Sequence, residues 1–290
     1  MRISIVGLGI MGSAIARNVI AAGFTVTGFD VAKSACDALA SIGGTVARAA
    51  AEAADNAEIV LTSLPSVAAL DETAAALATK ARPGLVLAEL STLPIEAKLR
   101  CRDTLAKAQI AMLDCPLSGT GAQAVTRDLA IYASGERADY DRAAPVFAAL
   151  ARAPHYVGNF GNGSKLKFIA NLLVAIHNVA SAEAMVLAIK AGLDPADVIA
   201  LIKSGVGNSR IFELRAPMMA KNDYQPATMK IDIWQKDMAV IGEFAKSLGV
   251  ATPLFAATVP VYNAAIGLGH GADDTAAVCA VLEKMAGITR

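Results

Sequence analysis

The chain has 290 residues, enough for two domains with separate hydrophobic cores. Its content of 55% hydrophobic and 18% charged residues is typical of a compact globular protein and excludes a disordered one. The formal net charge is zero and the basic residues do not cluster, so we expect neither nucleic acid nor a membrane surface as a partner.

The four cysteines and three histidines are scattered along the chain without the spacing of metal ligands. We therefore predict no metal site, and free buried thiols in a reducing compartment. The apolar N-terminus carries Arg2 as the one basic residue of its first ten positions and four glycines before position 24, which argues against a signal peptide. Together these features predict a cytoplasmic protein.

A glycine-rich turn follows the first apolar segment. The chain reads as a strand at 2–6, the turn Gly7-Leu8-Gly9-Ile10-Met11-Gly12, a helix up to Gly23, and a second strand at 24–29 that ends at Asp30. This order is typical of a dinucleotide-binding βαβ unit, in which the glycines allow a tight turn, close approach to the pyrophosphate, and packing of helix on strand. Asp30 falls eighteen residues after Gly12, where a carboxylate binds the ribose hydroxyls and repels a 2′-phosphate. The predicted cofactor is therefore NAD rather than NADP.

Strands and helices continue to alternate up to residue 162. We predict helices at 34–42, 67–79, 95–108 and 140–150, and strands at 57–63, 84–89, 110–114, 129–134 and 155–157. This alternation predicts an α/β domain with a doubly wound parallel sheet, a Rossmann fold, whose ligands lie beyond the carboxyl ends of the strands. Leu64-Pro65, Ser91-Thr92 and Pro116–Gly121 each follow a strand and can line one crevice, although an ordinary turn explains each of them alone.

A run of small residues follows the strand predicted to end at Asp114. It reads Ser118-Gly119-Thr120-Gly121-Ala122. Bare backbone amides of small residues after a strand can form an anion-binding nest. A substrate carboxylate would fit there, with the hydroxyl of Ser118 as a further donor.

A long helix is predicted over 164–191, because neither Pro nor Gly interrupts these residues. Ser164 is its expected N-cap and Gly192 its expected stop. The helix is apolar around most of its circumference, so we expect it to be buried. Its polar residues argue against a membrane span.

Lys167 lies in the first turn of this predicted helix, with Asn171 one turn later on the same face. Desolvation and the positive end of the helix dipole both lower the pKa of a lysine placed there, which would suit it to general acid/base chemistry. A side chain that reaches solvent is the alternative explanation.

The rest of the chain is helical throughout. The predicted helices are 195–203, 212–219, 229–248, 253–267 and 275–285. We therefore predict two domains, an NAD-binding Rossmann domain over 1–162 and an all-α substrate and oligomerisation domain over 163–290. The large apolar surface of the second domain predicts a homo-dimer or homo-tetramer.

Four motifs in this order resemble the β-hydroxyacid dehydrogenases, the family of 3-hydroxyisobutyrate dehydrogenase, tartronate semialdehyde reductase and, more distantly, 6-phosphogluconate dehydrogenase. Gly7–Gly12 matches the family pattern G-x-G-x-M-G, and Asp114–Thr120 matches D-A-P-V-S-G-G with Thr120 in place of the last glycine. Gly161–Asn171 matches G-x-G-x-x-x-K-x-x-N-N with Ala170 in place of the first asparagine, and Lys236-Asp237 matches a late K-D pair. The resemblance covers essentially the whole chain.

The resemblance implies a role for each matching residue. Lys167 is similar to the catalytic acid/base and Asn171 to the partner of the substrate hydroxyl. Ser118, Gly119 and Thr120 are similar to the carboxylate cradle, and Lys236 to a residue that reaches over cofactor and substrate. The positions similar to those that line the cofactor are Gly7, Gly9, Ile10, Met11, Gly12, Asp30, Leu64, Pro65, Thr92 and Lys236.

Together these features predict NAD-dependent oxidation of the hydroxyl of a small 3-hydroxy acid, or the reverse reduction of the semialdehyde or keto acid. The segments NSRIFELRAP (208–217) and YASG (132–135) resemble the L-threonate dehydrogenase branch, so oxidation of a four-carbon sugar acid, contacted by Arg210 or Arg215, is an alternative. A structural ion pair is the competing explanation of each arginine. Two further hypotheses are a non-catalytic NAD-binding module and an imine reductase on the same architecture.

Overall fold

The computed structural model describes residues 1–80 and 82–290. The chain divides into two compact units, Met1–Lys167 and Phe168–Arg290, and the division falls inside the long helix α8 (Asn162–Lys190). The domain boundary predicted after residue 162 lies at the first residue of that helix.

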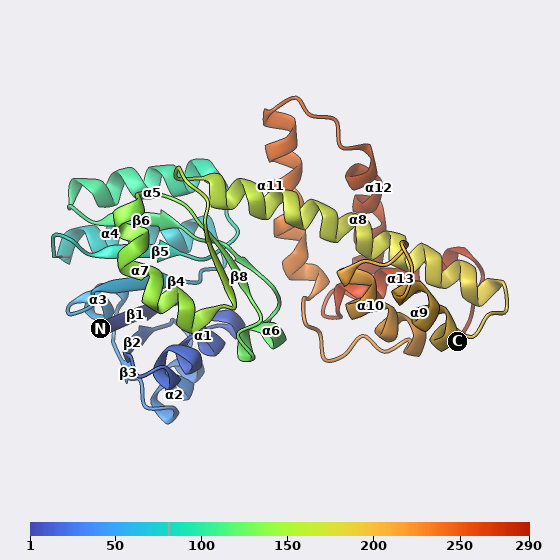
Figure 1. The fold of residues 1–290 in the computed structure, drawn as a ribbon, viewed down its shortest axis with the longest axis horizontal. Coiled ribbons are helices and arrows are strands. Elements are labelled where there is room, and N and C mark those ends of the chain that lie inside the picture. Colours follow the sequence, from blue (N-terminus) through green and yellow to red (C-terminus); the bar gives the residue numbers. More distant parts are fainter. Residues whose placement is uncertain (81) are drawn as a thin grey trace. The chain divides into compact units, whose positions relative to one another are not determined.

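The first unit contains a six-stranded parallel sheet in the order β3-β2-β1-β4-β5-β6 (Figure 1). Its strands are β1 (Arg2–Val6), β2 (Thr25–Phe29), β3 (Thr45–Val46), β4 (Ile59–Thr62), β5 (Val86–Glu89) and β6 (Ala111–Asp114). The helices between them are α1 (Ile10–Ala21), α2 (Lys33–Ser41), α3 (Ala50–Ala54), α4 (Val67–Lys80) and α5 (Ile95–Lys107). The strand order reverses at β1, as in a doubly wound sheet, so the predicted fold class is confirmed.

Both faces of this sheet are buried, which explains why its strands are apolar at nearly every position. Ile3 and Ile5 belong to the core beneath α1, α2 and α7 (Arg137–Leu150). Val6 belongs to the core beneath α3, α4 and α5. The alternation of side chains along each strand thus supplies two helical layers, with α1 and α2 on one side of the sheet and α4 and α5 on the other (Figure 1).

Three further strands form a separate sheet, β7 (Leu117–Ser118), β8 (Ala130–Ala133) and β9 (Ala153–Tyr156). β7 runs antiparallel to β8, whereas β8 and β9 are parallel. The expectation that 129–134 and 155–157 extend the parallel sheet is therefore wrong. The eleven residues 119–129, which include the short helix α6 (Gly121–Val125), are fewer than a parallel crossover usually needs.

The start of α8 differs from the prediction. The helix begins at Asn162, so Ser164 lies inside it and is not its N-cap, and Lys167 lies in the second turn. The amide and the hydroxyl of Ser164 both donate to the carboxylate of Asp114, each at 2.8 Å. A residue of β6 therefore caps this helix.

The prediction that α8 is buried is correct for only part of its circumference. The exposed fractions of Leu166, Ile169, Leu173 and Leu187 lie between 39% and 72%. Their spacing of three, four and fourteen residues puts them on one stripe of the helix. A sequence pattern shows that such a stripe is apolar and does not show what covers it.

Among the described helices, α8 alone is long and apolar enough to cross a membrane. Its polar side chains nevertheless bind partners within the second unit. The amide of Asn171 donates to Asp237 at 2.8 Å, and the amide of Asn178 donates to the hydroxyl of Tyr262 at 2.9 Å. These bonds are typical of a core helix, as predicted.

The second unit is helical, as predicted. After α8 it contains α9 (Pro195–Lys203), α10 (Arg210–Lys221), α11 (Ile231–Ser247), α12 (Pro253–Gly267), the 3₁₀ turn η1 (Thr275–Ala277) and α13 (Val278–Met285). Within its described residues, the one β-type pairing is the isolated bridge between Lys230 and Asp274.

Candidate active site

The three glycines of the first turn have different surroundings. A Cβ atom on Gly7 would lie 2.2 Å from the carbonyl oxygen of Ser63, and one on Gly12 would lie 1.9 Å from the carbonyl oxygen of Gly7. A Cβ on Gly9 would meet nothing within 4 Å. Close backbone packing therefore requires the first and third glycines, while the second faces open space at the start of α1. This arrangement fits a bound pyrophosphate.

Asp30 lies at the end of β2 and holds the same turn in place. One carboxylate oxygen accepts the amide of Leu8 at 2.6 Å, and the other accepts the amide of Ala32 at 2.8 Å. Each oxygen keeps a second acceptor site for a ribose hydroxyl. The surroundings of Asp30 therefore fit the predicted ribose contact.

Two predicted cofactor loops are joined by a hydrogen bond at the carboxyl ends of β4 and β5. The amide of Leu64 donates to the hydroxyl of Ser91 at 2.7 Å. Leu64 is buried, whereas Pro65 is exposed and Thr92 is half-buried. The loops after neighbouring strands thus form one edge, as a doubly wound sheet requires.

The predicted carboxylate cradle has more local structure than the sequence pattern of small residues indicates. Ser118 ends β7, and Thr120 is the N-cap of α6. The amide of Thr120 donates to the side chain of Gln123 at 3.0 Å, and the amide of Gln123 donates to the hydroxyl of Thr120 at 3.4 Å. Thr120 therefore does not offer the bare amide of a nest, and the spacing T-x-x-Q, a capping box, was the signal that could have revealed this.

The cradle lies next to the glycine turn. A Cβ on Gly121 would lie 2.5 Å from a methyl carbon of Ile10, and the amide of Asn18 in α1 donates to the carbonyl of Ala124 at 2.7 Å. α6 and α1 therefore pack together, and the predicted substrate and cofactor segments are neighbours within the first unit.

Lys167 is buried in the first unit, with an exposed fraction of 7%. The explanation in which its side chain reaches freely into solvent is therefore not supported. Asn171 and Lys236 belong to the second unit, where Asp237 binds both of them. One oxygen of Asp237 accepts the amide of Asn171 at 2.8 Å, and the other lies 3.2 Å from the ammonium of Lys236. The sequence pattern assigned no role to Asp237, because adjacency to Lys236 does not reveal a partner 66 residues away.

A buried ionic cluster lies at the carboxyl ends of β5 and β6. The ammonium of Lys98, from α5, lies 2.6 Å from Glu89 and 2.7 Å from Asp114, and all three side chains have no exposed surface. Burial alone lowers the pKa of Lys98, but the two carboxylates outweigh it and raise this pKa above 10.5. Lys98 therefore stays charged. The cluster could not be predicted from the sequence, because nothing in 95–108 separates an inward lysine from an exposed one.

The two arginines of the sugar-acid hypothesis have partners within the second unit. Arg215 is buried and donates to the hydroxyl of Thr228 at 2.6 Å and to Asp274 at 3.2 Å. Arg210 lies on the surface and binds Glu213 at 2.9 Å. Both contacts favour the structural explanation over contact with a substrate.

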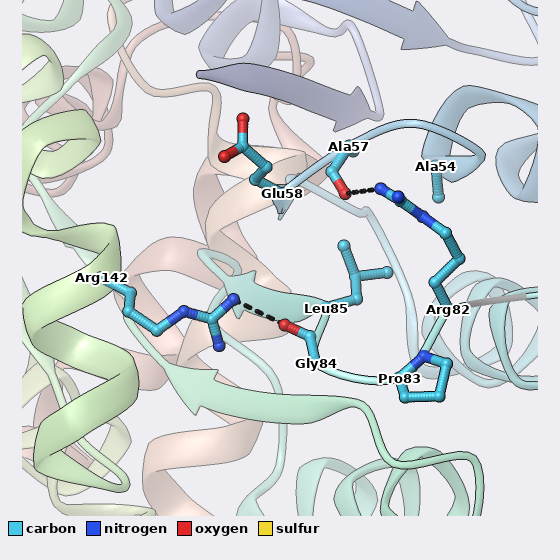
Figure 2. A pocket seen from close by; sticks show the side chains of 8 residues that line it. All are labelled: Ala54, Ala57, Glu58, Arg82, Pro83, Gly84, Leu85 and Arg142. Carbon is cyan, nitrogen blue, oxygen red and sulfur yellow. Dashed lines mark hydrogen bonds between the residues drawn. The ribbon is translucent and has the colours of Figure 1, made fainter.

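A separate pocket lies at the other end of the sheet, before β4 and β5. Figure 2 shows Arg82 donating to the carbonyl of Ala57 at 3.3 Å and Arg142 donating to the carbonyl of Gly84 at 2.6 Å. Because ligands of doubly wound sheets bind at the carboxyl ends of the strands, this pocket is not part of the candidate active site. Among the side chains that the structure describes, no three of the His, Cys, Asp and Glu residues come together as metal ligands.

The fold and the glycine turn define a class, the oxidoreductases that bind a nicotinamide cofactor on an α/β unit followed by a helical unit. Residues 2–158 match the family model of the NAD-binding domain of 6-phosphogluconate dehydrogenase. Residues 161–282 match the model described as NAD-binding of NADP-dependent 3-hydroxyisobutyrate dehydrogenase.

Individual proteins agree with these models. An L-threonate dehydrogenase of Cupriavidus necator is 33% identical, over 95% of this chain and 94% of that protein. A 3-hydroxyisobutyrate dehydrogenase of Salmonella typhimurium superimposes with a TM-score of 0.88 at 30% identity, over 97% of this chain and 99% of the other. The same enzyme of Mycobacterium tuberculosis, solved with L-serine, gives a TM-score of 0.88 at 28% identity, over 97% and 98%. The chain belongs to the β-hydroxyacid dehydrogenase family of NAD(P)-dependent oxidoreductases.

Proposed function

We propose that this protein oxidises a hydroxyl group of a small hydroxy acid with NAD, or reduces the corresponding carbonyl compound, and that Lys167 is the general acid/base. One observation carries the proposal. Lys167 is 7% exposed, and it lies near the start of α8 in the same unit as the glycine turn and Asp30. A buried amine close to a dinucleotide fold suits proton transfer at the carbon that reacts with the cofactor.

The chemistry assigns a task to each residue. A carbinol carbon releases hydride as its hydroxyl proton is withdrawn, so the neutral amine of Lys167 takes this proton and returns it in the reverse direction. Bound beside the glycine turn and Asp30, NAD would supply the hydride acceptor. Ser118 and Gly119 hold the substrate carboxylate, beside Thr120, whose amide and hydroxyl are engaged with Gln123. The fixed end of the substrate orients the reacting carbon.

For the second unit, the proposal is that Asn171 and Lys236 serve substrate binding, as the resemblance to the family implies. Asp237 limits the side-chain freedom of both residues through the contacts at 2.8 and 3.2 Å. Asp237 is therefore proposed to support Asn171 and Lys236 in their positions.

The substrate class is the finer part of the proposal. Because a relative at 33% identity is an L-threonate dehydrogenase, L-threonate is the first compound to test, followed by 3-hydroxyisobutyrate and glycerate.

The decisive experiment is Lys167→Ala with NAD and these three acids. We expect kcat to fall about 10²- to 10⁴-fold on whichever acid is turned over, the usual contribution of a general acid/base. Lys165→Ala is the matched control, because Lys165 is an exposed lysine two residues earlier on the same helix. Equal kcat values for wild type and Lys167→Ala would remove Lys167 from the mechanism.

Cofactor choice tests Asp30. Asp30→Ser removes the carboxylate that repels a 2′-phosphate, so we expect the ratio of kcat/KM for NAD to that for NADP to fall about tenfold, equivalent to about 1.4 kcal/mol. A wild-type enzyme that already prefers NADP would contradict this role of Asp30.

The two competing functions predict different outcomes in the same assays. A non-catalytic module would bind NAD without turning over any acid, and an imine reductase would act on cyclic imines but not on hydroxy acids. The presence of both Lys167 and Asn171 favours the dehydrogenase over these two.

We also propose that the protein is a cytoplasmic homo-dimer or homo-tetramer. The four cysteines are free and buried, which suits a reducing compartment. The apolar stripe of Leu166, Ile169, Leu173 and Leu187 on α8 suits contact with a second copy. Light scattering would detect a monomer, which would contradict the proposed self-association.

A further inference from the structure

We infer that Asp114 is a positioning residue that fixes the first turns of α8 and thereby Lys167, and that Lys98 and Glu89 hold Asp114 in place. The catalytic meaning of this inference rests on the proposed function. The structural part, that Asp114 fixes the start of α8, stands on the contacts alone.

Asp114 supplies the partners that the start of α8 needs. A helix leaves its first amides without intrahelical acceptors. The amide of Ser164 donates to Asp114 Oδ2 at 2.8 Å, its hydroxyl donates to Oδ1 at 2.8 Å, and the amide of Gly163 donates to the hydroxyl of Ser134 at 3.0 Å. A carboxylate at this end of a helix is further stabilised by the helix dipole.

The helix start also lies directly on the backbone of the neighbouring strands. A Cβ on Gly163 would lie 2.1 Å from the carbonyl oxygen of Tyr132 and 2.7 Å from that of Asp114. The backbone of β6 and that of β8 are themselves joined at this point, because Asp114 and Ser134 exchange amide–carbonyl hydrogen bonds at 2.9 and 2.8 Å. The hydrogen bonds and the close packing together leave the first turn of α8 little freedom.

Lys98 and Glu89 hold Asp114 from the other side. Two carboxylates share one ammonium, so by count of its groups the cluster has a formal charge of −1, and none of its side chains has exposed surface. Such a charge is costly to bury unless fixed dipoles face it. The amide and hydroxyl of Ser164 face Asp114 and offset this cost, so the cluster is more stable when α8 is in place.

The same cluster reaches the predicted cofactor loops. Lys98 donates to the carbonyl of Ser91 at 2.7 Å, the amide of Ser91 donates to Glu89 at 2.8 Å, and the hydroxyl of Ser91 accepts the amide of Leu64 at 2.7 Å. One connected set of bonds therefore runs from Leu64 to Ser164. Since Lys167 lies three residues after Ser164, on the same side of the helix, a shift of the first turn moves its amine. A displacement of about 1 Å at a catalytic group can cost about 100-fold in rate.

The test uses Asp114→Asn and the milder Ser164→Ala in the full-length protein, with amide hydrogen exchange read by mass spectrometry. We expect exchange in peptides covering 163–168 to rise about tenfold, the effect of losing one helix cap. We also expect kcat to fall about tenfold or more while the Kd for NAD, from titration calorimetry, changes less than twofold. Asp274→Asn is the matched control, because Asp274 is an equally buried aspartate in the second unit.

Ser164→Ala keeps the inference testable if Asp114→Asn folds poorly, since it removes one hydroxyl. Unchanged exchange at 163–168 in Ser164→Ala, or an equal rise throughout both units in Asp114→Asn, would overturn the inference. Faster exchange at 163–168 with an unchanged kcat per bound NAD would also overturn it, because Asp114 would then only stabilise the helix. A wild-type protein without turnover would remove the proposed function, and the exchange measurement would still decide whether Asp114 fixes the start of α8.

Discussion

Each unit contains one aspartate whose side chain is completely buried, and the two aspartates differ in how their charge is compensated. Asp114 in the first unit and Asp274 in the second have no exposed surface. Each accepts a backbone amide from the start of a helix or helical turn, Ser164 for Asp114 and Ala276 for Asp274. Each also binds a buried cation, Lys98 or Arg215.

The difference lies in the number of partners. Arg215 binds the carboxylate of Asp274 and the neutral hydroxyl of Thr228. Asp274 also accepts the amides of Thr228 and Met229 at 2.7 and 3.3 Å. Lys98 is shared between Asp114 and Glu89, so the first cluster has two carboxyl groups for one cation. The Arg215–Asp274 pair has one cation for one carboxylate and needs no further donor. The cluster of Lys98, Glu89 and Asp114 depends on the hydrogen bonds that Ser164 of α8 donates. In the first unit, which carries Lys167, the stability of the buried ionic cluster and the position of α8 therefore depend on each other.

The largest expected effect comes from removing the cation in each cluster. Lys98→Met leaves two carboxylates without a cation and should cost about 3–5 kcal/mol of unfolding free energy. Arg215→Met should cost less, because Asp274 keeps its backbone amides. Urea unfolding read by circular dichroism and by fluorescence separates the units, since Trp234, the single tryptophan of the chain, lies in the second unit.

The two signals should respond in opposite ways. Lys98→Met should lower the urea midpoint read by circular dichroism more than the midpoint read by Trp234 fluorescence. Arg215→Met should lower the fluorescence midpoint more. Lys33→Met, which removes an exposed ion pair with Asp37, is the control and should change stability by less than about 1 kcal/mol. A larger loss for Arg215→Met than for Lys98→Met would contradict the comparison.

An intermediate effect is expected from glycines beside the two clusters. Gly163→Ala would place a Cβ against two backbone carbonyls, so the helix start must move, at a cost of about 1–3 kcal/mol and with a loss of turnover. Gly271→Ala would meet the carboxylate of Asp232 at 2.5 Å, which can rotate away, so a smaller cost is expected. Thermal unfolding of both variants checks this order, and equal costs would show that the start of α8 is not tightly held.

The smallest effect concerns pH. Burial alone raises the pKa of Asp273, but hydrogen bonds from His270 and Gln225 outweigh it and lower this pKa below 3.8. The hydrogen bonds of Asp273 with His270 and Gln225 therefore stabilise the folded state above pH 3.8. This stabilisation is lost as the pH falls through the lower pKa of Asp273 in the folded state. Because Asp273 is partly exposed and screened, we expect less than about 0.5 kcal/mol.

The pKa of Lys98 is raised, so its contribution is complete below pH 10.5 and is lost only as the pH rises through the higher folded pKa. Acid should therefore weaken the Asp273 contact without titrating Lys98. In Asp273→Asn, the urea midpoint read by Trp234 fluorescence should fall slightly less in acid than it does in wild type. Its change with pH in alkaline solution should be the same in both proteins. Equal acid dependence of the Trp234 transition in wild type and in Asp273→Asn would contradict this role of Asp273.

The sequence alone determined the features that depend on neighbouring residues. The glycine turn, the alternation that predicts a doubly wound sheet, and the bounds 195–203 and 253–267 of two helices follow from local spacing and composition, and the structure agrees. The four motifs Gly7–Gly12, Asp114–Thr120, Gly161–Asn171 and Lys236-Asp237, in this order, predicted the family. The capping box at Thr120 was also present in the sequence, although the nest was preferred there.

The tertiary structure decided the features that depend on distant partners. Ser164 had the local chemistry of an N-cap, but Asp114, fifty residues earlier, caps the helix instead. Likewise, Lys98 and Asp237 became part of the site only when strands and helices placed carboxylates or amides beside them. Local patterns specify backbone conformation within a few residues, whereas the burial and pairing of charges depend on which segments the fold brings together.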